Sequence, residues 1–475
     1  MSRFKPSAAT PRVGFRNSAL APAVAQTALP ASLSPGARYP VRASRPVWEP
    51  DSGLRRIALY STVCFLFVRF TFLHEILALT LGLHSYLPPL FGVPALIGVI
   101  LGGGIQRVLR LKAVYLWLLF GGWLIVTVPF SSWPGNSAQA VFTYIEANLP
   151  IVLMIGGLTR SWSDLKLIIG SLACAGICNE LTAEYLSRNV GGRLELTGIV
   201  TIGNANDFAA HLLMLLPFVV FVGLSKEYPK ILRLLMLPTT LFALSFALRT
   251  GSRGAVLALA LTYVVIVITG RGASRLLFAL AIPVIAAMYF AVLPGELTKR
   301  FATILSPDDQ TAVSSGAAAD EAVASADGRK YLLRRGVELT LQHPLFGVGV
   351  ADFAVSEGST RAGGLTGRWM APHNTYTQVS SETGIPGLLL LVAALAASFR
   401  LSIKTRRQAS RLGMKGLSAA AYALAISFVL FCSSAFFLSL AYSIYFPTLA
   451  GLSLAMIPLL REQSRSASVL RATGH

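Results

Sequence analysis

His373 is the side chain in this sequence best placed for acid–base chemistry. It opens the run Pro372-His373-Asn374-Thr375-Tyr376, in which Asn374 or Thr375 is suited to cap a short helix that runs to Glu382. Such a helix would hold the imidazole at a fixed position, and histidine is the side chain most easily poised to accept a proton near neutral pH. A lone surface histidine is more often inert, so the residue type alone leaves both interpretations open.

Arginines occupy other polar segments of the chain. Arg253 follows Thr250-Gly251-Ser252 and begins an apolar stretch, where the adjacent glycines would let a ligand approach the backbone closely. Guanidinium groups bind phosphate oxygens through paired hydrogen bonds and stay charged at any relevant pH, whereas the alternative interpretation is anchoring to lipid headgroups. The remaining arginines of these segments are Arg193, Arg249, Arg329, Arg334, Arg335, Arg361 and Arg368.

For several further motifs and side chains, the sequence pattern favours a structural role. In Asn204-Ala205-Asn206-Asp207, Asn206 or Asp207 is predicted to cap the helix that follows, which does not exclude a role in a site. Gly347-Val348-Gly349 lacks the third glycine of a dinucleotide-binding loop and predicts a tight turn. Cys174 and Cys178 share one helix face without accompanying metal ligands, so packing is the favoured interpretation. The weaker candidates are Glu146, Glu180 and Glu184.

The elements that must position these groups are membrane helices. Of the 475 residues, 54% are hydrophobic and 13% are charged, whereas soluble domains carry roughly 25% charged residues. A bilayer is crossed by roughly 20 apolar helical residues, and the pattern predicts an all-α polytopic membrane protein with about twelve spans. The first predicted span is broken or re-entrant around Arg69, His74 and Glu75. The predicted spans are 57–81, 87–104, 113–131, 140–158, 165–184, 208–224, 231–248, 254–269, 275–293, 384–399, 417–438 and 442–460.

The positive charge predicts orientation. The chain has 41 Lys and Arg against 21 Asp and Glu, a formal net charge of +20. Every second loop between the predicted spans is basic, while loops 82–86 and 132–139 contain no Lys or Arg. Both termini are therefore expected on the cytoplasmic side, and the excess charge is a topology signal rather than an indication of nucleic-acid binding.

These boundaries divide the chain into five predicted parts. Within the long outer loop, residues 306–328 are of low complexity and are expected to be mobile, while Arg329–Gly384 has helix and turn signals. A loop of this length on a rigid scaffold tends to carry function. The parts are a disordered cytoplasmic tail (1–56), nine spans (57–293), a large periplasmic loop (294–383), three spans (384–460) and a cytoplasmic tail (461–475).

Four motifs in this order resemble the O-antigen ligase family of bacterial membrane glycosyltransferases, which also includes O-antigen and exopolysaccharide polymerases. The resemblance covers roughly residues 140–400. The motifs are Gly203-Asn204-Ala205-Asn206-Asp207-Phe208-Ala209, Thr250-Gly251-Ser252-Arg253-Gly254-Ala255, Gly328-Arg329 with His343-Pro344-Leu345-Phe346-Gly347-Val348-Gly349, and His373-Asn374-Thr375-Tyr376 with Glu382-Thr383-Gly384-Ile385-Pro386-Gly387.

The resemblance implies a fold of the GT-C type and an enzyme of the bacterial inner membrane with its active face in the periplasm. It implies metal-independent, inverting transfer of a glycan from undecaprenyl diphosphate to a lipid or glycan acceptor, without a cofactor. By matching motifs, Arg253 and Arg329 would bind the diphosphate and His373 would be catalytic. Leu333 stands where the family often has an aromatic residue, so Arg334 or Arg335 could share the role of Arg329. The other implied substrate-binding residues are Arg193, Asn206, Asp207, Tyr376 and Glu382.

The sequence leaves alternative functions open. Within the family, a ligase transfers to lipid A-core, a polymerase transfers to a growing glycan, and transfer to a protein hydroxyl is a third possibility. Ser381-Glu382-Thr383-Gly384 favours the ligase. A transporter or flippase is the alternative from another class, with arginines lining the path of an anionic or lipid-linked substrate. Convergence of Arg253, Arg329 and His373 in an outer pocket would favour the enzyme.

Overall fold

The chain divides into two units, Met1–Pro50 and Asp51–His475, and only the second contains residues that the structure describes. The structure is a computed structural model. It describes residues 53–190, 192–270, 279–280, 282–283, 287, 295–302, 317–359 and 369–473.

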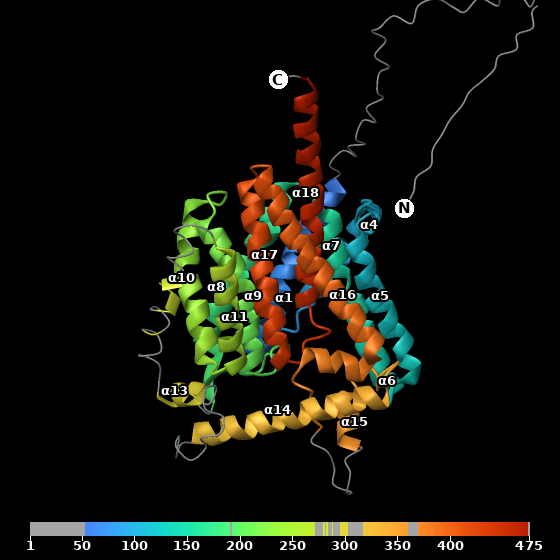
Figure 1. Ribbon diagram of the computed structural model, residues 1–475, viewed down its shortest axis with the longest axis vertical. Helices are drawn as coiled ribbons and strands as arrows, with labels where there is room; N and C mark the ends of the chain where they lie inside the picture. Colours follow the sequence, from blue (N-terminus) through green and yellow to red (C-terminus); the bar gives the residue numbers. More distant parts are fainter. Residues whose placement is uncertain are drawn as a thin grey trace, which may run out of the picture. The chain divides into compact units, whose positions relative to one another are not determined.

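Helices make up most of the described chain (Figure 1). The first half contains α1 (Gly53–Thr71), α2 (Leu73–Leu81), α3 (Leu87–Leu101), α4 (Gly104–Leu109), α5 (Lys112–Thr127), η1 (Val128–Phe130), α6 (Pro134–Thr143), η2 (Tyr144–Asn148), α7 (Pro150–Leu158) and α8 (Trp162–Leu186). A two-stranded antiparallel hairpin follows, made of β1 (Ser187–Val190) and β2 (Arg193–Leu196). The second half contains α9 (Ala205–Leu224), α10 (Lys230–Arg249), α11 (Arg253–Thr269), α13 (Gly295–Ala302), α14 (Ala317–Gln342), α15 (Phe353–Ser359), α16 (Thr375–Arg411), α17 (Lys415–Ser434), η3 (Ala435–Phe437) and α18 (Tyr445–Thr473).

The described helices confirm an all-α polytopic membrane protein. Seven are long and apolar enough to cross a membrane, or eight if the bent pair α1–α2 counts as one span. Two shorter apolar helices, α3 and α11, coincide with further predicted spans. The predicted span 275–293 lies largely outside the described residues, so the total of about twelve stays a prediction.

Three predicted boundaries differ from the structure. α1 begins at Gly53, inside the segment predicted as a tail, while residues 1–52 lie outside the described residues. α18 continues to Thr473, so most of the predicted C-terminal tail is helical. Residues 317–328, predicted to be mobile, form the first half of α14, while residues 303–316 lie outside the described part.

The first span is broken, as the sequence predicts. α1 and α2 meet at a bend of 55°, where Phe72 adopts a left-handed conformation with φ 55°. The break frees the carbonyl of Phe70, which accepts a hydrogen bond of 3.0 Å from Nδ2 of Asn179. The same amide contacts Nε2 of His211 at 2.8 Å, and Nδ1 of His211 lies 3.0 Å from the hydroxyl of Tyr445. A buried polar chain therefore compensates for the break.

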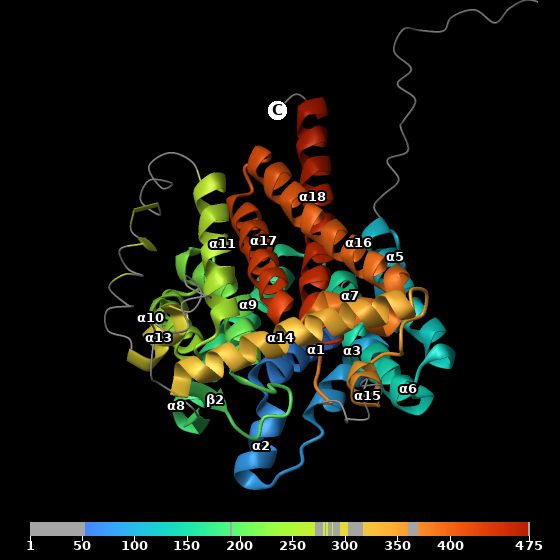
Figure 2. The ribbon, with the colours of Figure 1, turned by 60° about the horizontal axis from the view of Figure 1, so that its bottom comes forward.

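In the segment between α11 and α16, α14 crosses one end of the helical bundle (Figure 1). The turned view in Figure 2 shows α14 in front of the bundle ends, with α13 near one of its ends and α15 near the other. Its apolar side is buried in a small cluster formed by Leu332, Leu339, Val348 and Phe353. This packing holds α14 against α15 and the turn before it.

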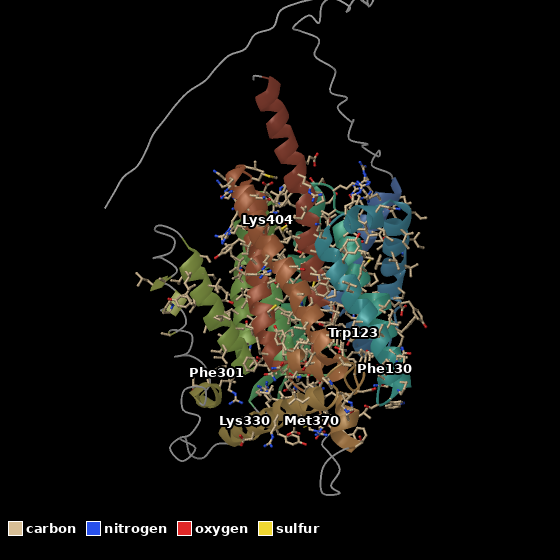
Figure 3. The ribbon with its side chains drawn as sticks, turned by 45° about the vertical axis from the view of Figure 1, so that its right-hand side comes forward. Trp123, Phe130, Phe301, Lys330, Met370 and Lys404 are labelled. Atoms are coloured by element: carbon tan, nitrogen blue, oxygen red, sulfur yellow. The ribbon has the colours of Figure 1, made fainter. Side chains whose placement is uncertain are left out.

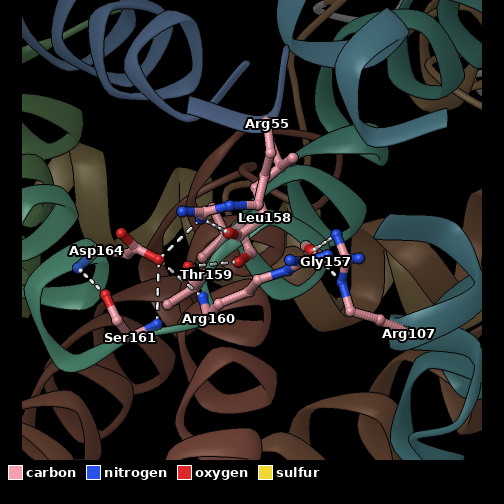
Figure 4. A network of polar contacts seen from close by, with 9 residues as sticks. Arg55, Arg107, Gly157, Leu158, Thr159, Arg160, Ser161 and Asp164 are labelled. Carbon is pink, nitrogen blue, oxygen red and sulfur yellow. Dashed lines mark hydrogen bonds and ion pairs between the residues drawn. The ribbon is translucent and has the colours of Figure 1, made fainter. Parts of the chain in front are cut away.

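The turn between α7 and α8 is fixed by a polar network (Figure 4). Ser161 and Asp164 form a capping box at the start of α8. Arg55 pairs with Asp164 at 2.9 Å and also donates to the carbonyl of Leu158. Arg107 donates to the carbonyl of Gly157. The buried charges at this turn are thus paired or hydrogen-bonded.

Candidate active site

His373 lies on a constrained turn directly before α16. Asn374 caps the helix, because its Oδ1 accepts hydrogen bonds from the backbone N–H groups of Tyr376 at 2.9 Å and Thr377 at 3.0 Å. His373 itself has φ 49°, an unusual conformation for a residue with a Cβ. Its N–H donates a 2.9 Å hydrogen bond to Oγ of Ser439. The predicted cap at Asn374 is confirmed, and it fixes the backbone that carries the imidazole.

The segment between η3 and α18, residues 438–444, holds the start of α16. Oγ1 of Thr375 donates to the carbonyl of Leu438 at 2.7 Å and accepts from the N–H of Leu440 at 3.1 Å. Oε1 of Gln378 accepts from the N–H of Ala441 at 3.3 Å. We call residues 435–444, which comprise η3 and this segment, the 435–444 clamp.

Arg329 reaches His373 from α14. A Cβ placed on Gly336 would lie 3.2 Å from Cβ of Thr377, and one turn further on the hydroxyls of Thr340 and Ser380 are 2.8 Å apart. α14 and α16 therefore run alongside one another in the same direction, and Arg329, about two turns before Gly336, lies near the start of α16.

The surroundings of His373 change the pKa of its imidazole. Burial lowers the pKa of its imidazole below the usual value of 6.5, and the positive charge of Arg329 lowers it further. His373 is half-buried. At neutral pH the ring is therefore largely uncharged and able to accept a proton.

Arg253 precedes a glycine that packs against the 435–444 clamp. It is the first residue of α11, after the N-cap Ser252, whose Oγ accepts from the N–H of Ala255. A Cβ on Gly254 would lie 2.7 Å from Cδ2 of Phe437, so only glycine allows this contact. Phe437 stands two residues before Ser439, the hydrogen-bond partner of His373. The starts of α11 and α16 therefore both contact this clamp.

Arg193 connects β2 to two other segments of the chain. It lies on β2 and is 8% exposed. Its Nε donates to the carbonyl of Thr250 at 2.8 Å, and its guanidinium also donates to Oδ1 of Asn206 at 3.1 Å. The guanidinium thus connects the start of α9 to the turn that precedes Arg253.

The N-cap of α9 corrects one prediction. Asn204, rather than Asn206 or Asp207, is the cap, because its Oδ1 accepts from the N–H groups of both of those residues. Nδ2 of Asn204 also donates to the Asp207 carboxylate at 3.0 Å. Asn206 and Asp207 stand in the first turn, so their side chains project from the helix and do not close its end.

Arg334 and Arg335 share one partner. Both form ion pairs with the carboxylate of Glu338, at 3.0 Å and 3.2 Å. The side chain of Arg334 is 84% exposed, whereas that of Arg335 is 14% exposed. Arg361 and Arg368 lie outside the described residues, and Arg249 is exposed with its guanidinium 5.6 Å from the ring centre of Phe246.

Glu382 belongs to an interlock between two of the sequence motifs. Gly384, with φ 74°, and Pro386 interrupt the hydrogen bonding of α16. The freed carbonyls of Ser381 and Glu382 accept from the N–H groups of Val348 and Gly349, at 2.8 and 2.9 Å. The interlock is completed by Nε1 of Trp123, which donates to Thr383 O, and by the N–H of Ile385, which donates to Pro344 O.

The Glu382 side chain is 2% exposed beneath this interlock. Burial and the neighbouring Glu382 carboxyl raise the pKa of the Tyr442 phenol in the 435–444 clamp well above its ordinary value. The hydroxyl of Tyr376 donates to the carbonyl of Cys432 at 2.9 Å. Both Glu382 and Tyr376 therefore connect α16 to neighbouring segments, and their predicted contact with substrate stays a prediction.

Sequence reasoning missed Ser439 and Asp352. Ser439 falls in a three-residue gap between predicted spans, where no motif marks it. Asp352 accepts from Ser131 Oγ and Asn136 Nδ2, both at 2.6 Å, and from the N–H of Trp133 at 3.1 Å. It thereby ties the predicted tight turn at Gly347–Gly349 to the start of α6. Asp352 is the third residue after Gly349 and is an acid suited to such capping, which was a usable signal.

Among the described residues, no group of three or more His, Cys, Asp and Glu side chains is arranged to hold a metal ion. What the described chain does present is a polytopic helical membrane protein in which a histidine, an arginine and the 435–444 clamp meet at one end of the bundle. Residues 238–392 match the family model described as O-antigen ligase, and this match supports an assignment to that family. No curated protein matches the chain. The matched segment contains Arg253, Arg329, His373 and Glu382, and it excludes Arg193, Asn206 and Asp207.

Proposed function

We propose that the chain transfers a glycan from undecaprenyl diphosphate to an acceptor hydroxyl at the periplasmic face of the bacterial inner membrane. The observation that carries this proposal is the position of His373, half-buried on the turn before the capped start of α16, where the charge of Arg329 and burial lower the pKa of its imidazole. A proton acceptor beside an anion-binding cation is what glycosyl transfer from a diphosphate requires.

The chemistry uses three side chains. The acceptor oxygen attacks the anomeric carbon from the side opposite the diphosphate, so the configuration at that carbon inverts. His373 takes the proton of the acceptor hydroxyl, and the bond between the sugar and the diphosphate breaks with its electron pair moving to the phosphate oxygen. Arg329 and Arg253 meet the charge that grows on this leaving group, which stabilises the transition state more than the ground state. No metal takes part in this scheme.

We assign the acceptor to lipid A-core, which makes the protein a ligase. The support is the Ser381-Glu382-Thr383-Gly384 run, which resembles that branch of the family. A polymerase of the same superfamily would use the same donor and a growing glycan as acceptor. The two functions differ in the products that remain when activity is lost, so one experiment separates them.

The test is the glycan profile of cells that carry His373→Ala as the only copy. We expect loss of surface glycan and accumulation of lipid-linked precursor on the periplasmic side. The matched control is His343→Ala, since His343 is an exposed histidine of the same outer segment. Both variants need wild-type abundance in the membrane.

Other outcomes would contradict the assignment. Single repeats still attached to core in the His373→Ala strain would indicate a polymerase. Precursor retained on the cytoplasmic side would indicate a transporter. A normal glycan profile would remove His373 from the mechanism.

A further inference from the structure

A second site lies at the end of the bundle opposite His373. Figure 3 shows Lys404 near one end of the helices and Met370, three residues before His373, near the other. Around Lys404 the start of α5, the C-terminal part of α16 and the middle of α18 line a pocket of about 1010 Å³. Pockets for small ligands usually measure roughly 300–1,000 Å³, so this one has room for a large molecule.

Five cations line the pocket, and its described lining contains no acidic residue. They come from the α4–α5 junction, the last two turns of α16 and the middle of α18, which are distant in sequence, so they converge in space and are not a run of charge along one helix. None of the five forms an ion pair with another described residue, in contrast to Arg55 at the α7–α8 turn, which pairs with Asp164. The cations are Arg110, Lys112, Lys404, Arg411 and Arg461.

The pocket also has an apolar half. On α16 the lining residues run from Ala397 and Leu401 to Lys404, Gln408 and Arg411, all on one helix face. The same change from apolar to basic occurs on the other two helices. There the apolar residues are Leu116 of α5 and Leu454, Ile457 and Leu460 of α18.

The distance along α16 from the apolar to the basic end of the pocket matches the thickness of one membrane leaflet. From Ala397 to Arg411 the helix rises about 21 Å, at 1.5 Å per residue. One leaflet with its headgroups is about 20–22 Å thick, half of a bilayer. A ligand that fills the pocket therefore has an anionic head and a hydrocarbon body of the length of a phospholipid.

We propose that this pocket binds an anionic glycerophospholipid, with its phosphate groups among the five cations and its acyl chains against the apolar half. Five cations exceed what one phosphate can neutralise, so a lipid with two phosphates, such as diphosphatidylglycerol, fits better than one with a single phosphate. Basic pockets between membrane helices are suited to such headgroups.

The experiment uses the delipidated full-length protein in detergent and native mass spectrometry. The probes are diphosphatidylglycerol, phosphatidylglycerol, zwitterionic phosphatidylethanolamine of matched chains, and inorganic phosphate. We expect affinity to fall in that order. The double variant Lys404→Ala with Arg411→Ala should bind diphosphatidylglycerol about thirtyfold more weakly, at about fivefold per basic residue.

The matched control is the double variant Arg400→Ala with Arg407→Ala. It removes two positive charges from α16 at positions outside the pocket. Both residues are exposed and neither lines the pocket. This control should change affinity less than threefold. A third variant, Ile457→Trp, fills the apolar half and should weaken lipid binding while leaving all five cations in place.

Three results would overturn the proposal. Equal losses in the two double variants would show diffuse surface charge instead of a pocket. Phosphatidylethanolamine binding as tightly as diphosphatidylglycerol would remove the charge selectivity. Inorganic phosphate binding as tightly as the lipid, unaffected by Ile457→Trp, would make this a site for soluble phosphate.

Discussion

The backbone N–H of His373 donates a 2.9 Å hydrogen bond to Oγ of Ser439, at a residue whose φ is 49°. A left-handed conformation costs a residue with a Cβ roughly 1–2 kcal/mol, while one hydrogen bond contributes about 0.5–1.5 kcal/mol. The bond to Ser439 alone therefore only approximately offsets the strain. The cap at Asn374 and the contacts of Thr375 supply the remainder, so the position of the imidazole depends on the whole 435–444 clamp.

We therefore expect Ser439 to act as a positioning residue for the proposed base. We expect Ser439→Ala to lower the transfer rate about fivefold, the equivalent of one hydrogen bond, because His373 then samples unproductive backbone conformations. Ser439→Thr keeps the acceptor oxygen and should restore most of the rate. The measurement is transfer from a lipid-linked glycan by purified protein, with the thermal midpoint recorded for each variant. If the threonine variant is as slow as the alanine variant at equal stability, the positioning role is wrong.

If His373 is the catalytic base that we propose, we expect burial and the charge of Arg329 together to determine the pH at which activity is lost. Burial and the Arg329 charge lower the pKa of His373 below 6.5, so the neutral base persists at neutral pH and activity falls only as the pH drops through that lowered pKa. Arg329→Gln removes one of the two causes. We expect the acid limb of kcat/KM to move to higher pH, toward 6.5, together with a rate loss of about 10²-fold from weaker stabilisation of the leaving group.

The control for Arg329 is its neighbour Lys330. This lysine is exposed and pairs with Asp327, so Lys330→Gln removes the same charge one residue away without changing the surroundings of His373. The acid limb should stay in place in Lys330→Gln. An equal shift in both variants would mean that general surface charge, and not Arg329, determines the pKa.

Asp352 should matter for stability more than for chemistry. Asp352→Asn places an amide against donors from the segment before and at the start of α6, since the carboxylate accepts from Ser131, Trp133 and Asn136. A buried donor left without an acceptor costs about 1–3 kcal/mol. The free energy of unfolding should fall by that amount in a denaturant titration. Asp327→Asn, which removes an exposed carboxylate, should change it by less than about 1 kcal/mol.

The sequence was informative where function or helix ends impose particular residue types. Apolar runs predict the spans, and the polar interruption at Arg69–Glu75 predicts the break in the first one, because intramembrane polar residues need partners. The cap at Asn374 can also be predicted from the sequence. A helix start leaves backbone N–H groups without partners, and a short polar side chain accepts hydrogen bonds from them. Motif order also indicates the family.

Contacts between segments that are distant along the chain could not be predicted from the sequence. Ser439 is an ordinary serine in a short gap, and its role depends on where η3 places it relative to the start of α16. Likewise, the motifs around Gly347 and Gly384 are separate in sequence, and nothing in either reveals that one supplies the hydrogen bonds that the other lacks. Periodicity predicts elements one at a time, whereas tertiary packing decides which polar groups meet.

The interlock gives the sharpest test of packing. Gly384 has φ 74°, and a Cβ there would lie 2.1 Å from the carbonyl oxygen of Leu345. Gly413 has almost the same φ, 72°, with no atom within 4 Å of a Cβ. Gly413→Ala should therefore lower the free energy of unfolding by about 1–2 kcal/mol, the cost of the left-handed conformation alone. Gly384→Ala adds a backbone clash and should cost about 1–3 kcal/mol more, as measured by the thermal midpoint of the detergent-solubilised protein. Equal losses in the two variants would show that α16 can move away from Leu345, and the interlock would then not be what fixes Glu382 relative to the helix start that follows His373.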